Sequence, residues 1–419
     1  MKVNGELGWP KIDADVGILI DNVLRSLKYC GNDAFGGVYF DRENPAVLHV
    51  NLLKGKERIL GFSDPSIVKT HFVRYSIEEL DKVQTQINDI VGKYSIEFVA
   101  RDEEANRLEI GVVDRSGENL EKIRSVIASM GIDVAELVYF SSASDHRDCE
   151  WGKAEVAKSI ANADSGNKNA ADSEALSTLS VRVGCWVGTK SSATGSALSA
   201  RSISFGAYYN GSPYFVTAGH TWGSIESGTS LYYADPPSNT TAYSSTPSNY
   251  STILAAGDGS NSTKIGTFFA AVCSGKVDFC SIARTNGNIS NYAYNNYTAR
   301  YIGGLPAVNQ IVRYTGISNR NIMGSGSASY GTCSSNNVSY VSVDGTTITN
   351  GIRMSTNSNA YPGSSGGPLM YLINSSDTNT VCITGMASKP DNENNCVYFT
   401  RVSELISQYN LVPAGLTLV

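Results

Sequence analysis

Apolar positions in the first 140 residues recur at the spacings of helices and strands. Over residues 12–30 they return every three or four positions, which predicts an amphipathic helix whose apolar stripe is Val16, Leu19, Ile20, Val23, Leu24 and Leu27. Residues 35–53, FGGVYFDRENPAVLHVNLL, hold two β-rich runs on either side of a polar Asn-Pro turn, and this pattern predicts a hairpin. Residues 1–65 are therefore expected to hold a helix and two paired strands.

A second group of elements follows in residues 66–140. THFVRYS, SIEFVA, RLEIGVV and VAELVYF are β-rich runs that predict four strands. SIEELDKVQTQINDIV and SGENLEKIRSVIASMG predict two helices between them. The first helix opens with the capping-box pair Ser76 and Glu79, and the second ends at Gly131. Strand, helix, strand, strand, helix, strand is the order of a ferredoxin-like α+β unit.

The pattern changes after residue 140. Residues 141–176 are rich in Ser, Ala, Asn and Asp and have no periodicity, so we expect an exposed linker that holds a processing site. From residue 177, short β-rich runs alternate with Gly, Asn, Ser and Pro turns as far as residue 400, and residues 401–410 predict one helix. We therefore expect an α+β region at 1–140, a linker at 141–176 and an all-β domain at 177–419.

The charge distribution separates the same two parts of the chain. Residues 1–180 carry 21 Lys and Arg against 30 Asp and Glu, a net charge of −9. Residues 181–419 carry 12 against 9, a net charge of +3. No stripe rich in Lys and Arg occurs, so nucleic acid is not an expected partner. No run of 18 apolar residues occurs either, so we expect no membrane partner.

The number and positions of the cysteines indicate the cellular compartment in which the protein is expected. Six of the eight, an even number, lie in the second part: Cys185, Cys273, Cys280, Cys333, Cys382 and Cys396. Such a set suits disulfides and export, and six buried free thiols are the alternative. The opening MKVNGELGWPKID holds no apolar leader. If the protein is secreted, we expect the leader to be missing from this sequence.

Ser365 lies between glycine-rich flanks in YPGSSGGPLM, residues 361–370. An ordinary turn has the same composition. A nucleophilic serine, however, needs a loop with few side chains, because its hydroxyl must be accessible and backbone N–H groups must converge on a developing oxyanion. Gly363 and Ser365 would supply those N–H groups.

Two more residues of the second part suit such a nucleophile. His220 ends YFVTAGH and is the only histidine in residues 181–419. A lone histidine is more often structural, but one that shares a domain with a glycine-flanked serine favours a general base. Asp278 lies in the apolar run VDFCSIA, where an unpaired carboxylate would be costly. It either orients the His220 ring or binds loop backbone.

These stretches resemble the chymotrypsin-like (trypsin-fold) serine proteases, in particular the bacterial branch of streptogrisins and α-lytic protease. TAGH resembles the histidine motif of that family, VDFCSIA its aspartate strand and GSSGGPL its nucleophile loop, in the family's chain order. VRYTG, ITGMAS and the closing helix are further similarities. The first part resembles the large pro-region of the same branch, so the resemblance extends over most of the chain.

The resemblance implies a secreted serine endopeptidase precursor, or zymogen. His220, Asp278 and Ser365 would be its catalytic triad, and Gly363 and Ser365 its oxyanion hole. The catalytic domain at 177–419 would consist of two six-stranded antiparallel β-barrels, and the pro-region would assist folding and inhibit the enzyme. The expected partners are protein or peptide substrates and the pro-region in cis. We expect a monomer without metal or cofactor.

The resemblance also implies a substrate strand. Ser388 would bond to Asp278 and lead this strand, with Ala387 and Lys389 on either side of it. Glutamate-selective members of the branch read the substrate with a second histidine near this strand, and here Met386 and Ala387 occupy that stretch. We therefore expect an apolar or aromatic P1 residue, although Lys389 would still attract acidic groups.

The sequence departs from the family pattern in four places. Lys389 and Pro390 follow Ser388 where glycine is common, and Thr221 and Asn359 stand where two cysteines are common. Ser364 replaces the Asp that precedes the nucleophile. In the bacterial branch that Asp is expected to pair with an Arg on a neighbouring strand, which Arg313 resembles. Here Arg313 would either find another acceptor, such as a carbonyl or Asp344, or turn to solvent.

Two alternatives follow from these departures. The first is a catalytically weakened pseudoprotease that serves as a binding module, which Ser364 and Pro390 favour and the complete set of triad residues opposes. The second is a hydrolase that acts on acyl groups other than peptides. Labelling of the active-site serine separates the first alternative, and turnover of casein against an ester separates the second.

Overall fold

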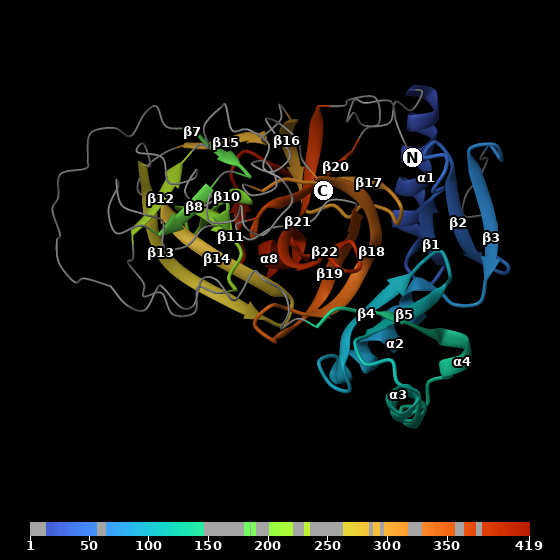
Figure 1. Cartoon of the computed structure of the whole chain (residues 1–419). Coiled ribbons are helices and arrows are strands. Elements are labelled where there is room, and N and C mark those ends of the chain that lie inside the picture. The colour runs from blue at the N-terminus through green and yellow to red at the C-terminus, as the bar shows by residue number, and fades with distance from the viewer. Residues whose placement is uncertain are drawn as a thin grey trace.

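The computed structural model describes residues 14–56, 64–145, 180–184, 186–189, 201–220, 230–234, 263–284, 288–293, 297–316, 329–356, 364–373 and 379–419. These residues are mostly β-strand and form three sheets. Figure 1 shows the N-terminal elements (blue and teal) along one flank of the second part of the chain (green to red). None of the helices in the described residues has the length and apolar character needed to cross a membrane.

The first unit is a helix packed on a small sheet. Helix α1 (Ala14–Cys30) buries Ile20, Val23 and Leu27 against that sheet. Its strands are β1 (Phe35–Phe40), β2 (Leu48–Leu53) and β3 (Val68–Val73). Strands β1 and β2 pair antiparallel, so the predicted helix and hairpin are confirmed. Strand β3 pairs with β2 in parallel.

The second unit follows the predicted order in part, because the predicted strand VAELVYF is a helix over Val134–Leu137 and a strand only from Val138. Its elements are α2 (Ile77–Ile87), the 3₁₀ turn η2 (Asn88–Ile90), β4 (Ile96–Asp102), β5 (Arg107–Val112), α3 (Gly117–Ser129), α4 (Val134–Leu137) and β6 (Val138–Ser142). The capping box is confirmed, because the Glu79 N–H donates to the Ser76 hydroxyl and the Ser76 N–H donates to the Glu79 carboxylate. Gly131 follows α3 with φ +82°.

The ferredoxin-like sheet is a wrong prediction. Strand β3 belongs to the first sheet, and the second unit has the strand order β6-β5-β4 without it. The first strand of a ferredoxin-like sheet would lie between its third and fourth strands, but β5 and β6 pair directly in parallel. Strand β4 instead uses its second edge to pair with β18 (Ser329–Val341), far along the chain. The pairing of β4 with the distant strand β18 thus replaces the strand pairing expected within the ferredoxin-like unit.

Six strands of the second part close on one another. Each pairs with two of the others, in the order β18, β17 (Ile311–Tyr314), β20 (Pro368–Leu372), β21 (Thr380–Asp391), β22 (Cys396–Arg401), β19 (Thr347–Thr356) and back to β18. This closed set is called the six-strand ring below. The arrangement of two barrels as a whole stays a prediction.

The other large sheet has eight strands. In spatial order they are β23 (Val412–Pro413), β10 (Phe205–Tyr209), β11 (Ser212–Thr217), β14 (Val277–Arg284), β13 (Thr263–Ser274), β12 (Ser230–Ala234), β8 (Trp186–Thr189) and β9 (Arg201–Ser202). Strands β16 (Tyr297–Ile302), β15 (Asn288–Ala293), β7 (Ser180–Val183) and β24 (Thr417–Leu418) extend from β21. The predicted closing helix is confirmed as α8 (Val402–Tyr409).

One apolar core joins the eight-stranded sheet to the six-strand ring. Phe205, Val216 and Phe279 of the sheet contact a cluster that includes Met370 and Met386 of the ring and Leu405 of α8. Burial of such side chains stabilises a fold by about 25 cal/mol per Å² of apolar surface. The core therefore holds the two sheets in a fixed relation, and functional residues from both can meet at their junction.

The disulfides expected in the second part are absent among the cysteines that the structure describes. Cys273, Cys280, Cys333, Cys382 and Cys396 are free thiols, and Cys185 lies outside the described residues. Cys280, Cys333 and Cys382 are buried in apolar clusters, where a thiol packs as a small hydrophobic side chain. Burial raises the pKa of Cys382 to about 12. The alternative of buried free thiols holds for these three cysteines, and Cys273 and Cys396 are half-buried free thiols.

Candidate active site

His220, Asp278 and Ser365 lie in one chain of hydrogen bonds. His220 follows β11, Asp278 is the second residue of β14, and Ser365 lies in the turn before β20. The His220 Nδ1 atom is 2.5 Å from the Asp278 carboxylate, and its Nε2 atom is 2.8 Å from the Ser365 hydroxyl. All three residues are buried. The structure thus brings together the three residues that the sequence singled out.

The Asp278 carboxylate is bound on both oxygens. Its Oδ1 atom accepts from the backbone N–H groups of Gly219 and His220, each at 2.7 Å, and its Oδ2 atom accepts from the Ser388 hydroxyl at 2.6 Å. Burial by itself would raise the pKa of Asp278, but the charge and hydrogen bonds of His220 and the hydroxyl of Ser388 outweigh it. The pKa of Asp278 therefore lies below its ordinary value.

The ionised carboxylate of Asp278 determines which nitrogen of the His220 ring donates a hydrogen bond and which accepts one. A carboxylate can only accept hydrogen bonds, so the Nδ1 atom of His220 donates to Asp278. In the neutral ring the Nε2 atom then has a free lone pair, which accepts the hydroxyl hydrogen of Ser365. This arrangement can take a proton from Ser365 while the positive charge on the ring is stabilised by Asp278.

The glycines of both motifs lie where backbone passes at close range. A Cβ atom on Gly219 would be 2.3 Å from the Phe279 carbonyl oxygen. One on Gly366, whose φ is +82°, would be 2.1 Å from the Thr217 hydroxyl and 2.4 Å from the Ser202 carbonyl oxygen. Any side chain here would force apart the strands that carry His220 and Ser365. The motifs therefore contain glycine for close packing, in addition to the need for an open nucleophile loop.

Three contacts around the site were not found from the sequence. The Ser202 N–H donates to the Ser365 carbonyl at 2.7 Å, and the Asp278 N–H donates to the Thr400 hydroxyl at 3.2 Å. The buried Arg201 guanidinium donates to the His220 carbonyl at 3.4 Å. No spacing or motif in the sequence marks these residues as part of the site.

The other predicted site residues have different outcomes. Gly363 lies outside the described residues, so its place in an oxyanion hole stays a prediction. Ala387 pairs through its backbone with Gly366 and Gly367, each at 2.9 Å. Lys389 is buried and forms an ion pair with Glu97 of β4.

The surroundings of Ser364 and Arg313 differ from each other. The Ser364 carbonyl accepts from the Tyr314 hydroxyl at 3.1 Å. The Arg313 guanidinium carbon lies 5.3 Å from the centre of the Tyr297 ring. Burial lowers the pKa of Arg313 from its ordinary value. The expected relation between Arg313 and Ser364 stays a prediction.

Comparison with solved structures finds proteases of bacteria. Thermobifida fusca protease A matches at 17% identity and a TM-score of 0.37, over 57% of this chain and 99% of that chain. Nocardiopsis protease matches at 18% identity and 0.38, over 56% and 98%. Cellulomonas bogoriensis chymotrypsin matches at 19% identity and 0.36, over 56% and 99%. The chain is similar to bacterial chymotrypsin-like serine proteases. No protein-family model and no curated protein matches the sequence.

Proposed function

We propose that the chain is the precursor of a secreted serine endopeptidase, with Ser365 as nucleophile, His220 as general base and Asp278 as the residue that orients the imidazole. The observation that carries this proposal is the buried hydrogen-bond chain from Ser365 through His220 and Asp278 to Ser388. Its members are in the order and at the distances that proton transfer requires.

The reaction follows from these contacts. The Ser365 oxygen attacks the carbonyl carbon of the scissile peptide bond while its proton passes to the His220 Nε2 atom. The carbonyl oxygen becomes an oxyanion, which the Ser365 N–H and a second backbone N–H stabilise. His220 then gives the proton to the departing amine, and the C–N bond breaks to leave an acyl ester on Ser365. Water, activated by His220, hydrolyses that ester and restores the hydroxyl.

A peptide substrate is favoured by the strand that Ser388 leads. Along residues 388–391, β22 pairs with one edge of β21, and we propose that the other edge receives the substrate. An extended peptide can add to such an edge through its backbone hydrogen bonds. Pro390 has no N–H and limits the number of those bonds. A substrate strand that begins at Ser388, whose hydroxyl binds Asp278, favours an endopeptidase over a hydrolase of small esters.

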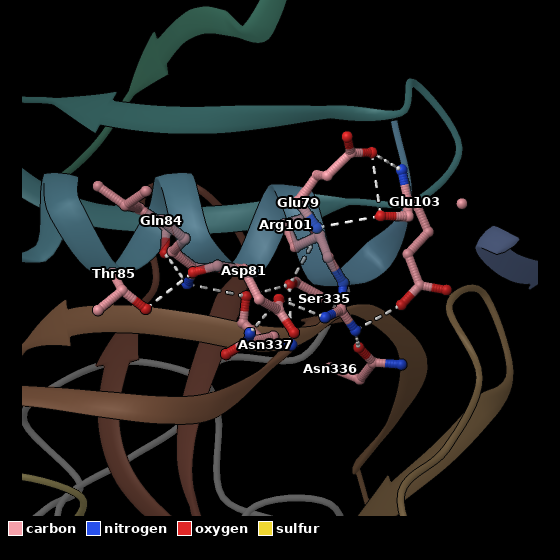
Figure 2. Close-up of polar contacts among 12 residues, drawn as sticks. Glu79, Asp81, Gln84, Thr85, Arg101, Glu103, Ser335, Asn336 and Asn337 are labelled. Atoms are coloured by element: carbon pink, nitrogen blue, oxygen red, sulfur yellow. Dashed lines mark hydrogen bonds and ion pairs between the residues drawn. The ribbon is translucent and has the colours of Figure 1, made fainter. Parts of the chain in front are cut away.

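The N-terminal part is proposed to be the inhibitory pro-region and folding assistant. Strand β4 extends the sheet of the six-strand ring by pairing with β18. Arg101 of β4 donates to Asn336 of β18 at 2.7 Å while it also binds Asp81 and Glu103, as Figure 2 shows. Beyond β6, the Ser144 hydroxyl donates to Asp391 at 2.6 Å. Ser144, just beyond β6, thus lies beside the end of β21.

Loss of the Ser365 hydroxyl tests this function. In the purified protein, Ser365→Ala should abolish hydrolysis of casein and of a small ester, apart from the residual that binding supplies. Ser407→Ala, an exposed serine in α8, is the control and should keep the wild-type rates. Casein hydrolysis by Ser365→Ala near the wild-type rate would refute the proposal. Wild-type protein that cleaves the ester but not casein would favour the acyl hydrolase.

A further inference from the structure

Tyr340 is a buried tyrosine of β18 that the proposed reaction does not use. The residue is 0% exposed, and its ring centre lies 5.0 Å from that of Tyr398 on β22. Both residues belong to a cluster that includes Phe98 of β4, and Phe98 pairs with Tyr340 across the two strands. Because interiors are close-packed, this cluster restricts where the phenol oxygen of Tyr340 can lie.

The Tyr340 hydroxyl has no hydrogen-bond partner among the residues that the structure describes. A buried hydroxyl without a partner is costly, and such groups are nearly always paired. Burial and the negative charge of Asp278 raise the pKa of Tyr340, and the nearby Ser388 and Thr400 hydroxyls act in the opposite direction. The phenol therefore keeps its hydrogen at neutral pH, close to two hydroxyls that contact Asp278.

The strand register places Tyr340 beside the same two residues. Thr400 lies two residues beyond Tyr398 on β22, so their side chains share one face of that strand. Ser388 precedes Lys389, which pairs with Tyr398. The Tyr398 ring, on which Tyr340 packs, is thus next to Ser388 and Thr400 in the sheet.

The hydrogen-bonding capacities of the three hydroxyls match one another. Ser388 donates its only hydrogen to the Asp278 carboxylate, so its oxygen remains able to accept. Thr400 accepts from the Asp278 N–H, so its own hydrogen remains to be donated. A phenol hydroxyl can accept one hydrogen bond and donate another. Tyr340 can therefore accept from Thr400 and donate to Ser388, which would close a ring of hydrogen bonds through Asp278.

We propose that Tyr340 is a positioning residue whose hydroxyl bridges Thr400 and Ser388 and keeps the Ser388 hydroxyl directed at Asp278. The inference rests on the proposed endopeptidase function and adds a residue to it. A donor to the Ser388 oxygen strengthens the hydrogen bond that Ser388 makes, because linked hydrogen bonds polarise one another. Tyr340 thus acts on catalysis through Asp278 and the orientation of His220.

Removal of the phenol oxygen tests this role. The full-length chain is activated by its own cleavage, or by a trace of thermolysin that is then blocked with a chelator, and rates are expressed per Ser365 that reacts with a phosphonate. Tyr340→Phe should lower kcat about threefold, the effect of about one hydrogen bond, and leave KM unchanged. Tyr398→Phe removes another buried tyrosine hydroxyl of the cluster and should keep the wild-type kcat. Equal kcat values for Tyr340→Phe and the wild type overturn the inference.

A double-mutant cycle separates positioning through Ser388 from a general effect on packing. In the Ser388→Ala background, Tyr340→Phe should change kcat by less than about 1.5-fold, because the oxygen on which Tyr340 acts is gone. If Tyr340→Phe lowers kcat by the same factor in both backgrounds, the two residues act independently and the proposed role is wrong.

Urea unfolding supplies a measurement that needs no activity. In the full-length Ser365→Ala chain, which should not cleave itself, Tyr340→Phe should raise the unfolding equilibrium constant about threefold to tenfold if the bridge exists. An unchanged or lower constant overturns the bridge. If the wild-type protein cleaves no casein and its Ser365 does not react with the phosphonate, the proposed function has failed, and the unfolding measurement still decides whether Tyr340 bridges Thr400 and Ser388.

Discussion

The Ser388 hydroxyl and the His220 Nδ1 atom bind the same carboxylate oxygen of Asp278, at 2.6 Å and 2.5 Å. Ser388 belongs to the six-strand ring and His220 to the eight-stranded sheet. Asp278 therefore links the two sheets at the point where chemistry is proposed. The proposed substrate strand begins at the same serine, so substrate position and imidazole orientation would depend on one short stretch of β21.

Removal of the Ser388 hydroxyl should weaken catalysis without abolishing it. Asp278 keeps two backbone donors and the His220 ring, so Ser388→Ala should lower kcat by about threefold to tenfold, the effect of about one hydrogen bond. Steady-state kinetics check this prediction. Ser281→Ala, a serine of the same strand as Asp278, is the control. A kcat of Ser388→Ala equal to that of the control would mean that this hydroxyl does not hold Asp278.

Gly366 and Gly211 separate backbone strain from close packing. Both have positive φ, +82° and +77°, but a Cβ atom would clash at Gly366 and would meet nothing within 4 Å at Gly211. Gly211→Ala should lower the free energy of unfolding by about 1 kcal/mol, from strain alone. Gly366→Ala should lower it by about 3 kcal/mol or more, and activity should be lost. Equal effects in urea denaturation would show that the approach of Thr217 to Gly366 is not tight.

Acid should loosen the three-stranded sheet of β1, β2 and β3. Partial burial, His49 and Lys69 lower the pKa of His71 from its ordinary value of 6.5. The His71 Nε2 atom is 2.7 Å from the His49 Nδ1 atom, so two charged rings cannot share this contact. Tyr39 stacks on His49, and it also bridges to Val308 of the second part. Protonation of His71, which contacts His49, therefore acts next to a contact between the N-terminal part and the second part.

The direction of the pH effect on stability follows from proton linkage. Because the pKa of His71 is lower in the folded state, the unfolded chain binds more protons, and stability falls as the pH drops below about 6.5. Hydrogen exchange of β1–β3 should accelerate between pH 7 and pH 5 relative to that of β4–β6. His71→Phe keeps an aromatic ring and should remove most of the difference. If exchange in β1–β3 is the same at both pH values after correction for intrinsic rates, the histidine pair is not the sensitive element.

Arg101 should hold the N-terminal part to the six-strand ring. Its buried guanidinium binds Asp81, Glu103 and Asn336, and Arg101→Leu would leave two carboxylates without their cation. Breaking a buried ion pair costs about 3–5 kcal/mol, so the cleaved precursor should dissociate much more readily. Arg107→Leu, an exposed arginine of β5, is the matched control. Dissociation constants from titration would contradict the prediction if the two variants were equal.

The sequence was informative where the structure depends on local signals. The capping box at Ser76 and Glu79, the stop at Gly131 and the closing helix follow from residues next to one another. The candidate triad residues could be found because Ser365 and His220 lie in short motifs that contain glycine and Asp278 interrupts an apolar run. The partners of each strand could not be predicted from neighbouring residues in this way. The partners of β3 and β4 depend on which distant edge is open, so the ferredoxin-like sheet was wrong although most of its elements were right.

The same limit applied to side chains whose partners are far along the chain. From the sequence, Lys389 was expected to lie in a substrate strand, and no residue near it in the sequence indicated its ion pair with Glu97. The hydrogen bond from Arg201 to the His220 carbonyl could not be predicted from the sequence either. The cysteine count predicted disulfides because it carries no information on distance. The five described cysteines of that set instead contribute to packing or bind nearby polar groups.

Reaction with a diphenyl phosphonate tests the central claim most directly. The reagent bonds covalently to a serine only when a nearby base activates the hydroxyl. With the cleaved full-length protein, mass spectrometry of the digested adduct should find one modified residue, Ser365, and His220→Ala should abolish the labelling while the folded state is kept. Labelling at another serine, no labelling of active protein, or equal labelling of His220→Ala would contradict the account.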